Sequence, residues 1–393
     1  MFSRTASRLR GDTNALYLLR DELTCRGRAL TDLVSGNVTE HGIRFPQALL
    51  EEIMARASRR CSTYRPDPLG QAPARAAISE YYHAAGLNVP EQNILLTPGT
   101  SMSYWYCFKL LADEGEEILC PRPTYPLFDY IAELSGVRLI YYPLREEKGW
   151  AIDFEGLENQ ISNATRAIVL ISPHNPTGHV AAPDEIDRLA EIARRHRLAV
   201  IADEVFSEFL ITRQCLPRIA LAGAPLVFTL NGFSKMFALP GLKFGWAAVS
   251  GDPDQVGQAM RALELISDTF LPVNEMVQAA APEIMSGGGD FLKWYSAEIR
   301  TRWAAMKEAL ETAALCRFVC PEGGFYVTLR LLEADEEAAS QAALSDHHIL
   351  VHPGYFYDMA PHHLVFSFAQ AADLTRQCLP KLEATWAVTG SKP

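Results

Sequence analysis

A lysine between two short apolar runs is the residue of this sequence best suited to covalent chemistry. Residues 226–230 and 244–249 are apolar enough to be buried strands, and the segment between them carries two glycines and a proline, which predicts a loop. Chemistry in α/β folds gathers where buried strands end. Desolvation there would lower the pKa of Lys235, and its neutral amine could then attack a carbonyl. An arbitrary Ser-Lys pair is usually a surface feature, so the remaining motifs decide between the two interpretations.

Other polar and small residues also follow predicted strands. Asp203 comes directly after the apolar run 198–202, and Asn175 comes shortly after the almost wholly apolar run 166–172. Residues 99–101 lie between a predicted strand and a predicted helix. Free backbone N–H groups and the positive end of the helix dipole at such a place form a cradle for a phosphate group. Each of these patterns is common in proteins, and taken alone it would be explained by a helix start or an ordinary turn.

The order of these segments resembles that of a known enzyme family. Ser234-Lys235 is followed by Pro-Gly-Leu-Lys-x-Gly-Trp at 240–246, and residues 175–178 read Asn-Pro-Thr-Gly. With Asp203 and the sequence Pro-Thr-Tyr-Pro at 123–126, this order resembles the pyridoxal-phosphate motifs of the class I and II aminotransferases. The resemblance extends over about residues 30–385. It implies pyridoxal 5'-phosphate as the cofactor and a homodimer as the active unit.

The resemblance also implies a role for each matching residue. Lys235 would form the Schiff base and move a proton, and Asp203 would face the pyridine nitrogen; these two are the expected catalytic residues. No metal site is expected. The expected cofactor-binding residues are Gly99, Thr100, Ser101 and Ser234 for the phosphate, Tyr125 stacked on the ring, Asn175 at the ring oxygen, Asp203, Phe206, Lys235, Lys243, and Tyr64 reaching the active site of the neighbouring subunit.

Three departures from the family pattern affect the cofactor. A serine or threonine is usual three residues before the lysine, where this chain has Gly232. Lys243 replaces an arginine that contacts the phosphate, which keeps the charge but loses the two-pronged geometry. Phe206 replaces a tyrosine whose hydroxyl supports the ionised ring oxygen. Loss of that donor is expected to raise the pKa of the Schiff base formed by Lys235.

The fourth departure affects the substrate. The C-terminal strand of most relatives reads Arg-x-Ser-Phe-Ala, and that arginine binds the α-carboxylate of the substrate. This chain has Val365 at that place, and a valine cannot pair with a carboxylate. Either another cation replaces the arginine, with Arg330, Arg44 and His363 as weak candidates, or the substrate is held differently.

Repeated strand, loop and helix units between residues 94 and 249 predict a doubly wound sheet. The expected fold class is α/β, PLP fold type I (aspartate-aminotransferase-like), with a mostly parallel doubly wound sheet and a smaller α+β C-terminal domain. We expect an N-terminal segment (1–45) packed on the small domain, a large cofactor-binding domain (46–289) and the small domain (290–393). A short strand is expected at 33–37, and three strands at 326–331, 349–351 and 364–368 would form the small sheet.

The composition and the net charge limit the classes of molecule that this protein is expected to bind. The chain has 393 residues, 48% of them hydrophobic, and a formal net charge of −11, which argues against nucleic acid as the main partner. No apolar run is long enough to cross a membrane. The eight cysteines are scattered and lack the spacing of a zinc site, which suggests reduced core residues. No secretory signal is visible at the N-terminus, and a cytoplasmic protein is expected.

Three functions fit this pattern. The first is an aminotransferase acting on an amino acid or amine. The second is a PLP-dependent β/γ-elimination, replacement or cyclising enzyme on the same fold, which the loss of the carboxylate-binding arginine and Phe206 favour. The third is a catalytically silent regulatory protein, ranked last because Lys235 and Asp203 are both present. Fold analogy does not choose between the first two, and the frequency of transamination in the family places it narrowly first.

Overall fold

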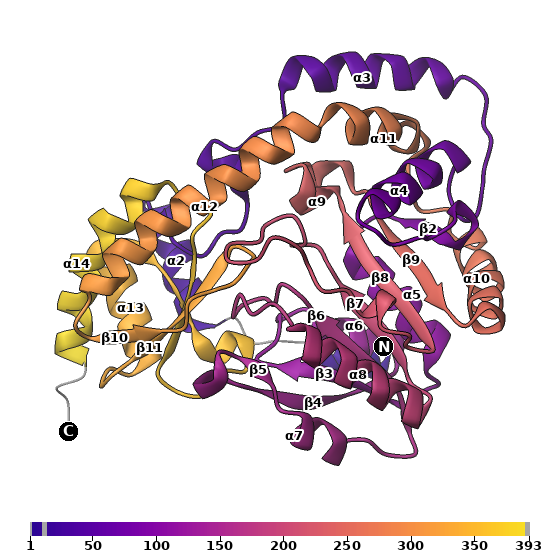
Figure 1. The fold of residues 1–393 in the computed structure, drawn as a ribbon. Helices are drawn as coiled ribbons and strands as arrows, with labels where there is room; N and C mark the ends of the chain where they lie inside the picture. The colour runs from indigo at the N-terminus through magenta and orange to yellow at the C-terminus, as the bar shows by residue number, and fades with distance from the viewer. Residues whose placement is uncertain (1, 10–13, 390–393) are drawn as a thin grey trace.

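The computed structural model describes residues 2–9 and 14–389, which form two layered regions joined by long helices (Figure 1). The larger region contains an eight-stranded sheet in the order β2-β9-β8-β7-β6-β3-β4-β5. Strands β3, β4, β6, β7 and β8 pair in parallel, whereas β9 is antiparallel to both β2 and β8. The expected mostly parallel, doubly wound α/β sheet is therefore confirmed. Its strands are β2 (Ile94–Thr97), β3 (Glu117–Arg122), β4 (Arg138–Arg145), β5 (Ala151–Ile152), β6 (Thr165–Ile171), β7 (Ala199–Asp203), β8 (Leu226–Gly232) and β9 (Gly245–Gly251).

Alternate side chains of the central strands face opposite layers. In β6, Val169 packs into the hydrophobic cluster that contains helices α5 (Thr100–Leu111) and α10 (Pro253–Asp268). Its neighbour Ile168 packs into the cluster that contains α8 (Pro183–His196). Both faces of the sheet are thus covered, which is why these strands are nearly continuous apolar runs. The two layers are completed by α6 (Phe128–Ser135) and α7 (Phe154–Asn159).

A second helical layer leads from the large sheet to the C-terminal region. Helix α11 (Glu275–Gly287) packs against α3 (Gln47–Arg60) and α4 (Ala72–Ala84). The 24-residue helix α12 (Gly289–Thr312) then runs down to α14 (Ala372–Thr389), as Figure 1 shows. One hydrophobic cluster includes buried residues from both regions, so the core is continuous across the proposed boundary at 289/290. The division into domains stays a prediction.

The small sheet differs from the expected one. It has four strands in the order β10-β11-β14-β13, namely β10 (Cys316–Phe318), β11 (Tyr326–Leu331), β14 (His363–Ser367) and β13 (His352–Pro353). The expected third member, β12 (Ile349–Leu350), pairs instead in parallel with β1 (Thr31–Asp32). Helix α13 (Glu336–His347) packs on α14 and on α2 (Ala15–Cys25), and a short helix, α1 (Arg4–Arg8), lies near the N-terminus. Helix α2 and strand β1 therefore lie against the C-terminal region, whereas α1 contacts α6 of the larger region.

Three local expectations were wrong for identifiable reasons. The strand expected at 33–37 is at 31–32, because its partner β12 ends at Leu350 and residues 33–37 turn away. The loop expected around Lys235 contains a short helix, α9 (Phe233–Met236), which begins at the end of β8. Of the cysteines, four are buried and Cys25, Cys215 and Cys320 are exposed, so they are not uniformly core residues.

A close backbone approach joins β9 to the start of α5. A Cβ on Gly245 would lie 3.0 Å from Gly99 Cα and 3.1 Å from Asn231 O. We expect Gly245→Ala to lower the free energy of unfolding by about 1–3 kcal/mol, because backbone atoms must move to accept the methyl group. Urea denaturation followed by circular dichroism measures this change. Gly241→Ala is the matched control, since no atom lies within 4 Å of its added Cβ. Equal stability of the two variants would contradict the close approach.

Candidate active site

One cavity of about 250 Å³ lies where β6, β7 and β8 end and α5 begins. It gathers residues from seven separate segments of the chain, as expected when several strands of a parallel sheet end at one edge. All but two of the predicted site residues line it. The lining residues are Gly99, Thr100, Ser101, Tyr104, Tyr125, Phe128, Ile131, Ile171, Asn175, Asp203, Val205, Phe206, Gly232, Ser234, Lys235, Phe244 and Tyr326.

Lys235 is the third residue of α9, the short helix that directly follows β8. Its Nζ has one hydrogen-bond acceptor among the described residues, the carbonyl oxygen of Gly36 at 3.4 Å. Burial lowers the pKa of Lys235 to about 8, and the Asp203 carboxylate acts in the opposite direction. A lysine with such a pKa is partly neutral near physiological pH. Its amine can therefore act as a nucleophile or accept a proton.

The residue three before Lys235 is a glycine for a steric reason. A Cβ on Gly232 would lie 2.8 Å from the carbonyl oxygen of Phe244 and 3.0 Å from Gly245 Cα. The β8–β9 pair is thus too close at this point for a serine or threonine. Ser234, which lines the cavity two residues later, is the hydroxyl that this segment offers instead.

Asp203 ends β7 inside the same cavity. Its Oδ1 accepts a hydrogen bond from the Val205 N–H at 3.0 Å, and its Oδ2 accepts one from the Tyr104 hydroxyl at 2.9 Å. Burial raises the pKa of Asp203 to about 6, while these hydrogen bonds and the charge of Lys235 lower it. The carboxylate is therefore fixed in position and faces a single cation. Tyr104 was not predicted, although its place one turn after Thr100 on the buried face of α5 was a usable signal.

Helix α5 begins at the cavity, and no side chain caps its N-terminus. Gly99 caps the N-terminus of α5, has a φ of 137°, and has no atom within 4 Å of the position of a Cβ. Only glycine adopts this backbone conformation readily. Thr100 and Ser101 follow as the first residues of the helix, where backbone N–H groups lack partners within the helix. The N-terminus of α5 can therefore accept an anion.

Asn175 enters the cavity from the loop after β6. Its Oδ1 is buried and has no hydrogen-bond partner among the described residues. An unpartnered buried amide is costly unless a bound group satisfies it. Gly178 ends this loop with a φ of 72°, and a Cβ there would collide with Pro321. The loop is thus pressed against the segment that leads into β11.

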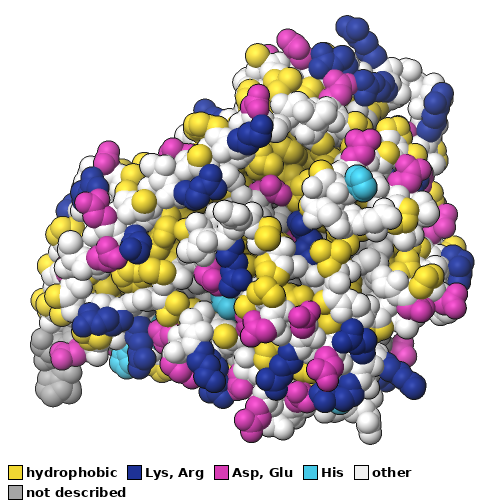
Figure 2. All heavy atoms as spheres, in the orientation of Figure 1, with side chains coloured by type: hydrophobic (Ala, Val, Ile, Leu, Met, Phe, Trp, Pro, Cys, Tyr) yellow, Lys and Arg dark blue, Asp and Glu magenta, His cyan; other side chains and the backbone are white. Residues whose placement is uncertain are grey.

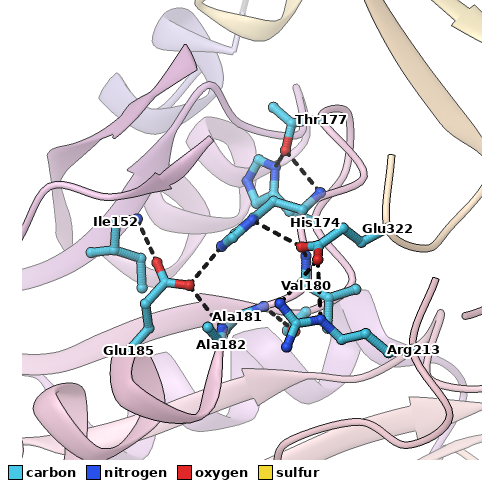
Figure 3. A network of polar contacts seen from close by, with 11 residues as sticks. Ile152, His174, Thr177, Val180, Ala181, Ala182, Glu185, Arg213 and Glu322 are labelled. Atoms are coloured by element: carbon cyan, nitrogen blue, oxygen red, sulfur yellow. Dashed lines mark hydrogen bonds and ion pairs between the residues drawn. The ribbon is translucent and has the colours of Figure 1, made fainter. Parts of the chain in front are cut away.

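A network of charged residues fastens that loop to its surroundings (Figure 3). His179 Nε2 lies 2.9 Å from Glu185 Oε2, and His179 Nδ1 lies 3.4 Å from Glu322 Oε2. Arg213 pairs with the other oxygen of Glu322 at 2.9 Å. The backbone N–H of Glu322 donates to the carbonyl oxygen of Gly178 at 2.8 Å. Segments around residues 174–182 and 322–326 are therefore held together beside the cavity.

The titration of this network follows from its partners. Burial alone lowers the pKa of His179, but hydrogen bonds and charges of Glu185 and Glu322 outweigh burial and raise it to about 9. Burial raises the pKa of Glu322, and the contacts with His179, Val180 and Arg213 outweigh that effect and lower it to about 2. His174, also buried, is neutral because burial and His179 lower its pKa to about 3. The network is therefore an ion pair across most of the pH range.

Two predicted residues lie outside the cavity. Lys243 is exposed and follows the 3-10 helix η5 (Pro240–Leu242) in a left-handed conformation. Tyr64 is 70% exposed and lies by Arg65 and Glu275 in a separate surface depression. A role for either residue toward the cofactor stays a prediction.

None of the three candidate carboxylate partners lines the cavity. Arg330 is 61% exposed and lies 3.8 Å from Glu146, and the buried His363 contacts the same carboxylate at 3.2 Å. Arg44 is exposed and donates to the Thr39 carbonyl oxygen at 3.2 Å. Of the described residues that line the cavity, Lys235 is the only lysine or arginine.

The described residues show neither a metal cluster nor a membrane-spanning helix. Lys and Arg side chains are interspersed with Asp and Glu on the face shown in Figure 2. Within residues 2–9 and 14–389, no group of three or more His, Cys, Asp or Glu side chains is placed to hold a metal ion. No helix in this described part is long and apolar enough to cross a membrane.

Sequence comparisons place the chain among known proteins. Residues 29–378 match the family described as "Aminotransferase class I and II". The chain is 29% identical over 266 residues to glutamate-pyruvate aminotransferase AlaA of Haemophilus influenzae, which covers 66% of this chain and 65% of that protein, just under two thirds of its length. It is 26% identical over 360 residues to alanine aminotransferase of Mycobacterium tuberculosis, covering 87% of this chain and 82% of that protein.

Solved structures agree on the fold. An aminotransferase from Escherichia coli superposes with a TM-score of 0.90 at 24% identity, covering 100% of this chain and 99% of that chain. An alanine aminotransferase from Pyrococcus furiosus superposes with a TM-score of 0.92 at 21% identity, covering 99% of this chain and 100% of that one.

The His179 network generates a pH prediction. A raised histidine pKa contributes stability that is complete below the unfolded value of about 6.5 and is lost as the pH rises through 9. We expect the free energy of unfolding to fall by on the order of 1–3 kcal/mol between pH 6.5 and 9, and His179→Gln to remove much of this fall. Urea denaturation at a series of pH values measures it. His83→Gln, which changes an exposed histidine on α4, serves as the control. An unchanged pH profile in His179→Gln would rule the network out as the cause.

Proposed function

The chain belongs to the class I and II aminotransferases, and from that premise we propose that it transfers amino groups between an amino acid and a 2-oxo acid with Lys235 as the central catalytic residue. One observation carries this proposal above the others. Lys235 and Asp203, the pair that the chemistry needs, line one buried cavity, and burial moves the pKa of each toward neutrality. The relatives named above are aminotransferases, which favours transamination over the elimination and cyclisation hypothesis.

The cavity residues fit pyridoxal 5'-phosphate, the cofactor of this family. The uncapped N-terminus of α5, with Thr100, Ser101 and nearby Ser234, suits a phosphate group. Asn175 also lines the cavity, and its side-chain NH2 group would donate to the ring oxygen. Tyr125 would contact the face of the ring. When bound, this cofactor supplies a carbonyl that condenses with amines and a pyridine ring that withdraws electrons from the amine-bearing carbon.

Lys235 would act twice. As a partly neutral amine, Lys235 would bind the carbonyl that the cofactor supplies. In its free form, its Nζ would take a proton from the substrate Cα as a general base and would then give that proton to the carbonyl carbon of the cofactor as a general acid. A pKa near the working pH suits both directions of this transfer.

Asp203 would serve the ring nitrogen. Its carboxylate is fixed by Val205 N–H and the Tyr104 hydroxyl, so it meets that nitrogen without reorganising. A negative carboxylate there keeps the nitrogen protonated, which strengthens the electron withdrawal that lets Lys235 remove the Cα proton. Tyr104 thus acts through Asp203 as a positioning residue.

The remaining expectations complete the proposal. The active unit would be a homodimer in which the exposed Tyr64 reaches the phosphate bound by the partner subunit. Lys243 would contribute charge near that phosphate, and the protein would work in the cytoplasm. From the names of the relatives, L-alanine and L-glutamate are the first donors to test.

A half-reaction tests the proposed function. Protein reconstituted with pyridoxal 5'-phosphate is mixed with L-alanine or L-glutamate in the absence of any 2-oxo acid. We expect loss of the visible absorption band together with about one equivalent of pyruvate or 2-oxoglutarate per site. Lys235→Ala should abolish this conversion, whereas Lys307→Ala, on the exposed side of α12, should not. Continuous release of ammonia without loss of the band would instead indicate an elimination enzyme.

Phe206 generates a spectroscopic prediction. Its ring lines the cavity, and a phenol at this position would donate to the ionised ring oxygen. We expect Phe206→Tyr to lower the pH midpoint of the visible absorption change by on the order of 1 unit, because the hydrogen bond stabilises the unprotonated form. Phe206→Leu, which adds no donor, is the control. A midpoint that rises or stays unchanged in Phe206→Tyr would show that this position does not face the ring oxygen.

A further inference from the structure

Tyr326 is a half-buried residue of the cavity whose hydroxyl the reaction described so far does not use. It is the first residue of β11, and its side chain lines the cavity together with Lys235 and Phe206. Its ring lies edge-on to that of Phe206, with centroids 6.3 Å apart. Within the described part of the chain, the hydroxyl has no hydrogen-bond partner. A hydroxyl that lines a cavity and has no protein partner can donate to a bound ligand.

The hydroxyl lies beside the reacting nitrogen. Lys235 Nζ is 3.4 Å from the carbonyl oxygen of Gly36. A Cβ placed on Gly36 would collide with Tyr326 Oη and would lie 3.5 Å from Lys235 Nζ. Both side chains therefore converge on the same glycine. In every amino acid a carboxylate is attached to the carbon that bears the amine, so the carboxylate is the acceptor that all such substrates can bring close to this hydroxyl.

The phenol is suited to donate. Burial raises the pKa of Tyr326 well above its ordinary value, and the charges of Tyr125 and Asp32 raise it further. The hydroxyl thus keeps its proton at every pH at which the protein would work. It presents a neutral O–H group to a ligand.

The two residues paired with Val365 in the sheet offer no cation for this role. Val365 is fully buried, and its neighbours in the sheet are Thr328 on one side and His352 on the other. Burial lowers the pKa of His352 to about 4, so its ring is neutral. Both ring nitrogens already contact hydroxyls, those of Tyr17 at 3.1 Å and Tyr357 at 3.2 Å.

We propose that the hydroxyl of Tyr326 binds the α-carboxylate of the amino-acid substrate by a hydrogen bond, in place of the ion pair that a cation at position 365 would form. This inference rests on the proposed function, since it assumes an amino-acid substrate bound at Lys235. It names the group that selects amino acids over amines. Tyr326 is therefore a specificity-determining residue.

An equilibrium measurement tests the contact without any turnover. 2-Methylalanine and tert-butylamine both lack a Cα–H bond, so Lys235 has no proton to remove, and the amine carries a methyl group in place of the carboxylate. Their dissociation constants are obtained by titrating the visible absorption of the protein reconstituted with pyridoxal 5'-phosphate. We expect wild-type protein to prefer 2-methylalanine. Tyr326→Phe should weaken binding of 2-methylalanine by roughly 10- to 100-fold and leave binding of tert-butylamine unchanged, as for a hydrogen bond to a charged group.

Tyr295→Phe provides a matched control. It removes the hydroxyl of a second tyrosine without a hydrogen-bond partner, which is buried against Phe209 and Phe291 rather than lining the cavity. This variant should keep the wild-type preference. A second readout is the pH midpoint of the visible absorption without ligand, which Tyr326→Phe should not move.

Three results would overturn the inference. Equal weakening of both ligands in Tyr326→Phe would mean a packing role, and a shifted absorption midpoint with unchanged preference would mean that the hydroxyl meets the cofactor. A wild-type protein that takes up the cofactor yet does not prefer 2-methylalanine would overturn the carboxylate contact alone. Failure of the protein to take up the cofactor at all would count against the proposed function, and the inference would fall with it.

Discussion

The burial of Lys235 together with Asp203 is the constraint on which the rest of the site depends. A buried ion is expensive to desolvate, and each of these groups partly compensates the other. Their positions follow from β7 and β8, neighbouring parallel strands that end at the same edge of the sheet. The antiparallel β9 then covers the segment that carries Lys235, and its closeness to Gly232 leaves no room there for a side chain. The same packing that excludes water therefore moves the lysine pKa into a useful range.

The second constraint is that the cavity is built by both regions of the chain. Asn175 comes from the large sheet, but its loop is fastened through Gly178 and His179 to Glu322, just before the small sheet. Tyr326 follows four residues later in that segment and reaches Gly36, whose neighbours pair with the C-terminal region. A displacement of the small sheet would move Tyr326 and strain the loop of Asn175 together. The polar network therefore links Tyr326, which would bind the substrate, to the loop of Asn175, which would bind the ring of the cofactor.

Sequence reasoning located the residues that end strands or begin helices, because those positions carry local signals. Lys235, Asp203, Asn175 and residues 99–101 were placed in this way, and all line the cavity. It did not find Tyr104 or Tyr326, whose importance comes from what faces them across the fold. The pairing of β1 with β12, and the membership of β10 and β13 in the small sheet, were missed for the same reason. Two- and three-residue strands have too little periodicity to be recognised, and only their partners define them. Glycine at 232 looked like a departure until the approach of Phe244 explained it.

The replacement of a cation by valine at position 365 changes what can orient a substrate. A guanidinium holds both oxygens of a carboxylate and so fixes its plane, whereas one hydroxyl holds a single oxygen and leaves rotation about that contact. In the proposed reaction Lys235 would remove a proton efficiently only if the Cα–H bond pointed toward it, so the missing constraint would have to come from elsewhere. The shape of the cavity can supply this constraint. Tyr125 and Phe206 line it with aromatic rings, and Asn175 lines it from a loop that hydrogen bonds and ion pairs hold in place. Since these surfaces would contact the side chain of a substrate as well as the atoms around its Cα, orientation in the proposed reaction would depend on that side chain more than it would beside an arginine.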